Sequence, residues 1–110
     1  MKFLKLFSPL KIRHMTLSNR IVMPAMHLNL ADSMFSTQKL NDFYVERAKG
    51  GAGLLIMGGC AISPLQQGGP FMVALHDDKF IPKLKEFCDQ VHAAREDVKV
   101  AAQLYASGAY

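Results

Sequence analysis

Few side chains in this sequence could carry out chemistry, and they are spread along the chain. Its two cysteines, Cys60 and Cys88, form no C-x-x-C pair, so they predict no local zinc or iron–sulfur site. We expect Cys60 to be a small buried apolar residue. His27 follows an apolar run, and its imidazole could exchange protons near neutral pH. The other histidines match no catalytic pattern and are expected at the surface: His14, His76 and His92.

Three further groups follow apolar runs: the turn Pro24-Ala25-Met26, the pair Gly58-Gly59 and the lone amide of Gln103. No G-x-G-x-x-G or G-x-x-x-x-G-K-[ST] loop is present, which disfavours the two commonest phosphate-binding loops. Small residues and one amide could border a flat aromatic cofactor. A purely structural interpretation stays open: the proline and glycine end strands, the methionine fills the core, and the amide satisfies a backbone group.

Apolar patterning places these groups on a strand–helix–strand unit. Residues 21–23 predict a strand covered on both faces that ends at Pro24, and residues 25–34 predict a loop. Ser36 or Thr37 could cap a helix that ends at Gly50-Gly51. Residues 53–57 then predict a second buried strand that closes at Gly58-Gly59.

The pattern repeats in the second half of the chain. A loop rich in glycine and proline, residues 63–70, precedes a helix from Ile81-Pro82 to about residue 94, and residues 98–104 predict a third strand. Parallel strands with right-handed crossovers place all three carboxyl ends at one edge, so residues 24–27, 58–60 and 103–106 should meet there. Both a barrel and a doubly wound sheet fit this alternation. Residues 10–17 predict a small hairpin or plug.

Length and charge narrow the classes of protein further. The net charge of +4 comes from basic residues scattered between Lys2 and Lys99, which disfavours nucleic-acid binding. Lys5 and Ser8-Pro9 interrupt the apolar start, and no run reaches the length of a membrane span, so a cytoplasmic protein is expected. A (β/α)8 barrel usually needs about 250 residues, so 110 residues would hold less than half of one.

Four motifs together resemble the start of the Old Yellow Enzyme, or NADH:flavin oxidoreductase, family: residues 6–10 (LFSPL), 17–23 (LSNRIVM), 43–48 (FYVERA) and 51–53 (GAG). Their order and spacing agree over the whole chain. Met26-His27 and Met57-Gly58-Gly59 look like the branch that contains 2,4-dienoyl-CoA reductase and trimethylamine dehydrogenase.

The resemblance implies an α/β fold in which residues 1–110 are the amino-terminal portion, about three strand–helix units, of one incomplete FMN-binding (β/α)8 TIM barrel domain. It implies hydride transfer from NAD(P)H through FMN to an activated C=C bond of a small molecule, such as an enone or an enoyl or dienoyl thioester. A flavin-dependent amine dehydrogenase and an inactive truncated fragment are the alternatives. A 4Fe–4S cluster would come from residues outside this chain, and a homo-oligomer stays open.

The resemblance also assigns site residues. The backbone of Pro24, Ala25 and Met26 would lie along the flavin ring, Gly59 beneath it, and the Gln103 amide would hydrogen-bond its pyrimidine part. His27 occupies a position from which some relatives reach flavin or substrate. Many relatives carry a histidine and an arginine where this chain has Ala106 and Ala109. That departure puts a standard substrate pocket in doubt.

Overall fold

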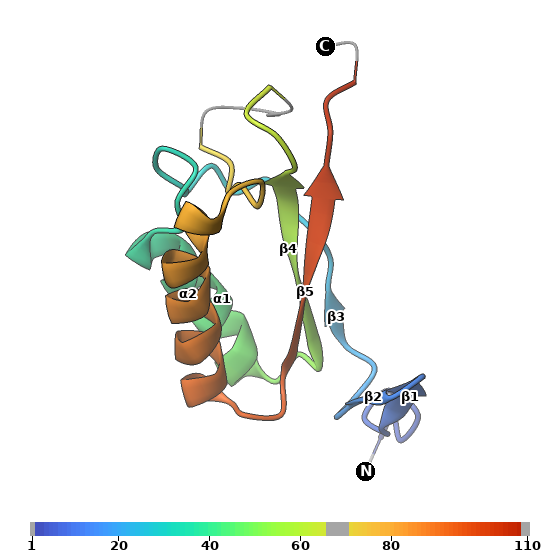
Figure 1. Cartoon of the computed structure of the whole chain (residues 1–110). Helices are drawn as coiled ribbons and strands as arrows, with labels where there is room; N and C mark the ends of the chain where they lie inside the picture. Colours follow the sequence, from blue (N-terminus) through green and yellow to red (C-terminus); the bar gives the residue numbers. More distant parts are fainter. Residues whose placement is uncertain (1, 66–70, 109–110) are drawn as a thin grey trace.

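The computed structural model describes residues 2–65 and 71–108. Two helices cover one face of a parallel sheet, and a small hairpin lies at the end where the strands begin (Figure 1). In chain order the elements are β1 (Leu10–Ile12), β2 (Met15–Leu17), β3 (Val22–Met23), α1 (Gln38–Gly50), β4 (Leu54–Ala61), the 3-10 helix η1 (Asp78–Phe80), α2 (Ile81–Ala94) and β5 (Lys99–Tyr105). No helix in this part of the chain is long and apolar enough to cross a membrane.

The sheet has the order β3-β4-β5, and both pairs of strands are parallel. Leu54 of β4 stands opposite Val22 on one side and Lys99 on the other. The predicted strand–helix–strand alternation is therefore confirmed, and the carboxyl ends of all three strands lie at one edge. The predicted hairpin is confirmed as well, because β1 pairs antiparallel with β2.

Helix α1 begins and ends where the sequence indicated. Thr37, rather than Ser36, caps the helix, and its hydroxyl accepts a hydrogen bond from the Leu40 amide at 3.2 Å. Gly51 follows the last turn with φ of 107°, a left-handed conformation that suits glycine. These two caps fix the length of the helix and return the chain to the sheet.

The core lies between the helices and the sheet. Tyr44 of α1 and Phe87 of α2 are buried and meet edge to face, with ring centroids 5.3 Å apart. Leu55 and Cys60 of β4 and Val98 before β5 are fully buried in the same cluster. Apolar side chains of both helices therefore pack into the same core.

The prediction that the first strands are covered on both faces is wrong for the described residues. Burial alternates along most of β4, and Val22 of β3 is 41% exposed. Both helices cover the same face, so alternate residues on the other face remain open (Figure 1). In a closed (β/α)8 barrel that face lines the interior, which explains the continuous apolar runs.

The second strand is also longer than predicted. β4 does not stop at Gly58-Gly59 but continues to Ala61, with an irregularity in its pairing to β5 between Met57 and Cys60. Glycine within a strand often marks a bulge or a close backbone approach, and both occur here.

The predicted loop 25–34 is confirmed, and it adds an isolated bridge from His27 to Gly58. The segment after the second predicted loop is buried at Met72, Val73 and Ala74, and Ala74 pairs with Ala61. Residues 66–70 of the predicted glycine- and proline-rich loop lie outside the described residues.

Candidate functional site

Three of the candidate segments meet in one row at the carboxyl edge of the sheet. A β-carbon on Gly58 would lie 2.3 Å from Cβ of Ala25 and 3.1 Å from Oε1 of Gln103. Ala25 follows β3, Gly58 lies in β4 and Gln103 lies in β5. The geometry that the sequence predicted for the turn, the paired glycines and the amide is thus present, and Gly58 is its centre.

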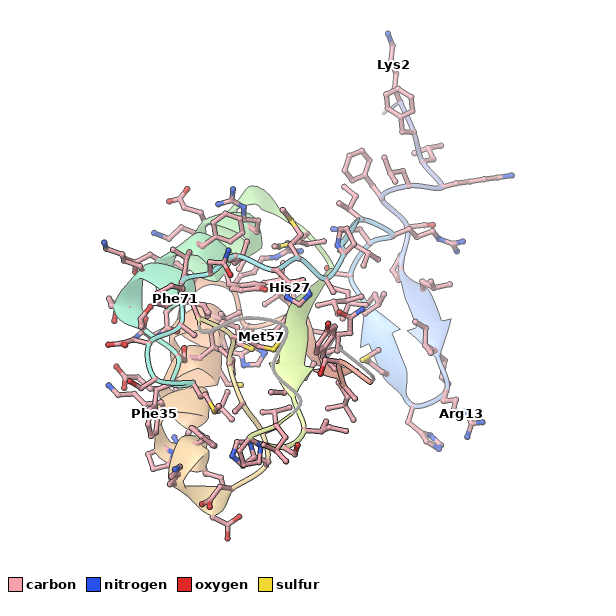
Figure 2. The ribbon with its side chains drawn as sticks, turned by 90° about the horizontal axis from the view of Figure 1, so that it is seen from above. Lys2, Arg13, His27, Phe35, Met57 and Phe71 are labelled. Carbon is pink, nitrogen blue, oxygen red and sulfur yellow. The ribbon has the colours of Figure 1, made fainter. Side chains whose placement is uncertain are left out.

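Gly59 belongs to a second row. A β-carbon on it would lie 3.0 Å from Cε1 of His27 and 3.1 Å from Cβ of Tyr105. The His27 and Tyr105 rings meet edge to face, with centroids 5.3 Å apart. Gly59 is consequently buried beneath these two side chains, whereas Pro24 and Gln103 are exposed and Met26 is 48% exposed. In Figure 2 the His27 side chain lies beside β4, close in view to Met57.

Gln103 is exposed at the carboxyl edge of the sheet. Within the described part of the chain no hydrogen bond engages its amide, which argues against the purely structural interpretation that it satisfies a backbone group. A primary amide offers both a donor and an acceptor, which suits the alternating carbonyl and nitrogen edge of a flavin. Small residues at positions 25 and 58 leave room for a planar ring beside it. The residues present therefore fit FMN, and their contacts to it stay a prediction.

The sequence placed Gly58 and Tyr105 at this edge without indicating what each contacts. A glycine inside an apolar strand could have indicated the close backbone approach at Gly58. No local signal marks the role of Tyr105 in covering Gly59, which depends on strand pairing. Nor does the sequence single out the Tyr44 hydroxyl, which is buried with no hydrogen-bond partner of good geometry in the described structure.

The titratable groups divide into surface and core. Burial raises the pKa of the Cys60 thiol to about 11, so the thiol is neutral at physiological pH and the expectation of an inert apolar residue is supported. His14 and His92 are exposed, as predicted. The surface prediction holds only in part for His76: the residue is half-buried, its Nδ1 is buried, and its ring packs edge-on against Phe80 with centroids 5.1 Å apart.

Two further features concern possible metal ligands and the rim of the site. Among the described residues no three histidine, cysteine or acidic side chains are grouped so that they could hold a metal ion. Ala106 is exposed near the end of β5, so the rim there lacks a polar side chain at this position. Ala109 lies outside the described residues.

Comparisons with known proteins identify the family and the fold. Residues 5–110 match the NADH:flavin oxidoreductase / NADH oxidase family. A metal reductase from Desulforamulus reducens is 45% identical over 106 residues, which are 96% of this chain and 15% of the relative. An N,N-dimethylglycine/sarcosine dehydrogenase from Chromohalobacter salexigens is 35% identical over 97 residues, which are 84% of this chain and 14% of the relative.

A solved structure is similar as well. The Old Yellow Enzyme homologue from Zymomonas mobilis superposes with a TM-score of 0.83 at 27% identity, covering 93% of this chain and 28% of that structure. This chain thus spans 14% to 28% of the lengths of these three proteins. The similarity confirms that the three parallel strands and two helices are the amino-terminal part of a TIM barrel. The chain belongs to the NADH:flavin oxidoreductase / NADH oxidase family, as its resemblance to Old Yellow Enzyme predicted.

Proposed function

We propose that the protein of which this chain forms part is an FMN-dependent oxidoreductase that takes hydride from NAD(P)H and passes it to a small-molecule acceptor. The juxtaposition of Ala25, Gly58 and Gln103 at the carboxyl edge of three parallel strands carries this proposal. Ligands bind at that edge in both barrels and open α/β sheets. Membership of the NADH:flavin oxidoreductase family supports the choice of cofactor and donor.

The residues of this chain would bind and orient the flavin. The Gln103 amide would donate to one atom of the pyrimidine edge and accept from the next. Pro24, Ala25 and Met26 would present main chain along the ring, and Gly58 would keep β4 free of a side chain beneath it. Gly59, which His27 and Tyr105 cover, would meet the ring only through its main chain. FMN, when bound, supplies the capacity to accept and release hydride. His27 stands one residue beyond the turn, so it could contact either flavin or substrate.

The acceptor is proposed to be an activated C=C bond in an enone or in an enoyl or dienoyl thioester. Amine oxidation is the second candidate, since a relative 35% identical is an N,N-dimethylglycine/sarcosine dehydrogenase. Anaerobic assays with the full natural-length protein separate the two. An ene-reductase would consume NAD(P)H when given the enone or thioester, whereas an amine dehydrogenase would become reduced by a methylated amine without NAD(P)H.

Flavin binding is tested by titrating the full natural-length protein with FMN and following flavin fluorescence. Gln103→Leu should weaken FMN binding by about tenfold, because a buried hydrogen-bonding pair is broken when the amide is lost. Gln90→Leu is the matched control, since Gln90 lies on α2 and its side chain hydrogen-bonds, among the described residues, to Gln38 and Glu86. Wild-type protein that binds no FMN would contradict the proposed function.

A different expectation applies to residues 1–110 on their own. In the described structure the outer edge of β5 is unpaired, and Leu104 is 67% exposed. Such edges favour aggregation or pairing with a second copy, and most of the layered barrel interior is missing. We therefore propose that the isolated segment binds FMN weakly or not at all. Tight stoichiometric binding by this segment would contradict the fragment hypothesis.

An iron–sulfur cluster would need ligands from outside this chain. Such clusters are usually held by four cysteines, and this sequence has two.

A further inference from the structure

A cavity of about 190 Å³ lies behind the glycines of β4. Its walls include His27 and Asn29 from the loop after β3, Leu40 and Tyr44 from α1, and Met57 and Gly58 from β4. Figure 2 labels His27 and Met57 from this lining. The cavity thus borders both α1 and the row of residues proposed to hold the flavin.

The Tyr44 hydroxyl is the unexplained group at this cavity. Tyr44 is 1% exposed, and its ring is fixed edge-on against Phe87. Within the described structure the hydroxyl makes no hydrogen bond of good geometry, although the Gly58 amide is near enough to act on it. Burial raises the pKa of Tyr44, and the nearby backbone amide of Gly58 lowers it only in part. The phenol therefore stays protonated and can both donate and accept.

Water is the occupant that best fits these surroundings. A buried hydroxyl without a partner is destabilising, and native structures satisfy most such groups with protein or ordered water. A water molecule occupies about 30 Å³ in the liquid and needs two to four polar partners, so this cavity has room for several. Besides Tyr44, the lining residues His27, Asn29 and Gly58 bring further polar groups to this cavity.

We propose that ordered water fills this cavity and joins the Tyr44 hydroxyl to the main chain at Gly58. Tyr44 is then a positioning residue, because it fixes, through water, the strand segment that contacts Ala25 and Gln103. The water site depends only on the fold. Its effect on cofactor binding rests on the proposed function.

The water site is tested with Tyr44→Phe in the protein at its full natural length, without FMN. Loss of a satisfied hydroxyl should raise the unfolding equilibrium constant in urea by about fivefold. The number of long-lived internal waters, measured by ¹⁷O relaxation dispersion, should fall by at least one. A variant as stable as the wild type or more stable would overturn the water site, since a dry, unpaired hydroxyl contributes only a desolvation cost. So would an unchanged number of long-lived waters.

The positioning role is tested separately. FMN affinity is compared at a temperature at which both proteins are folded, and Tyr44→Phe should weaken it by about threefold. Equal affinities would overturn the positioning role while leaving the water site standing. Wild-type protein that fails to bind FMN would instead refute the proposed function, and the urea and relaxation measurements would still decide the water site.

Discussion

Gly58 and Ala25 pack so closely that no side chain fits between them: a β-carbon on Gly58 would lie 2.3 Å from Cβ of Ala25 and 2.9 Å from its Cα. Gly58→Ala must therefore push β4 away from the end of β3. We expect a loss of about 1–3 kcal/mol in the free energy of unfolding, the usual range for overpacking, measured by urea denaturation.

Gly50→Ala is the matched control for this substitution. Gly50 is the last residue of α1, and a β-carbon on it would meet nothing within 4 Å. Alanine is favoured over glycine in a helix, so this variant should be unchanged or more stable by up to about 1 kcal/mol. Equal stability of both variants would show that β4 can shift at Gly58 without cost. The close packing of Ala25, Gly58 and Gln103 would then be contradicted.

Asn19 ties the start of the sheet to the end of α1. Its Nδ2 donates to the Gly51 carbonyl at 2.7 Å, and its Oδ1 accepts from the Ile21 amide at 2.9 Å. The side chain is 7% exposed, so Asn19→Ala leaves two backbone groups with poor access to water. We expect this variant to lose about 1–3 kcal/mol of unfolding free energy, from about 0.5–1.5 kcal/mol for each of the two part-buried hydrogen bonds.

Asn19→Asp separates the contributions of the two hydrogen bonds. A carboxylate still accepts from the Ile21 amide, but it cannot donate to the Gly51 carbonyl. The stability of the aspartate variant at pH 7 should therefore fall between those of the wild type and Asn19→Ala in thermal or urea unfolding. An aspartate variant less stable than the alanine variant would mean that repulsion from the Gly51 carbonyl outweighs the retained hydrogen bond.

Local signals in the sequence were sufficient for most of the fold. The caps at Thr37 and Gly51 and the proline at the start of α2 act within a few residues, so they could be read from the chain alone. Parallel strands follow from the alternation itself. The coverage of the strands could not be read, since an apolar run looks the same whether its second face meets a helix or a barrel interior.

The site was less predictable than the fold. The positions of Ala25 and Gln103, after or within apolar runs, predicted that they would lie at the carboxyl edge of the sheet. The same rule applies to the end of any strand, so it does not by itself distinguish a binding site. The contact between Gly59, His27 and Tyr105 depends on how β4 shifts register against β5 between Met57 and Cys60. Such irregularities arise from three-dimensional pairing, so no local pattern predicts them.

Thr37 holds the loop after β3 to helix α1. Its hydroxyl accepts from the Leu40 amide at 3.2 Å and donates to the Leu30 carbonyl. Thr37→Val keeps the shape of the side chain and removes both hydrogen bonds, so we expect a loss of about 1–2 kcal/mol in unfolding free energy. Thr37→Ser retains the hydroxyl and should lose less than about 0.5 kcal/mol. Similar losses in the two variants would indicate that the methyl group, not the cap, stabilises this corner.

Cys60 should make stability fall at alkaline pH. Burial raises the pKa of its thiol from 9.0 to about 11. Below pH 9 the thiol is neutral in the folded and unfolded states. As pH rises from 9 toward 11 the unfolded chain loses the proton first, so the folded state is destabilised by up to about 1.4 kcal/mol per pH unit. Urea unfolding of Cys60→Ala from pH 8 to 11 should lack this component, whereas Cys88→Ala should retain it. Parallel pH profiles for wild type and Cys60→Ala would show that the thiol is not desolvated, because groups such as lysines titrate equally in both.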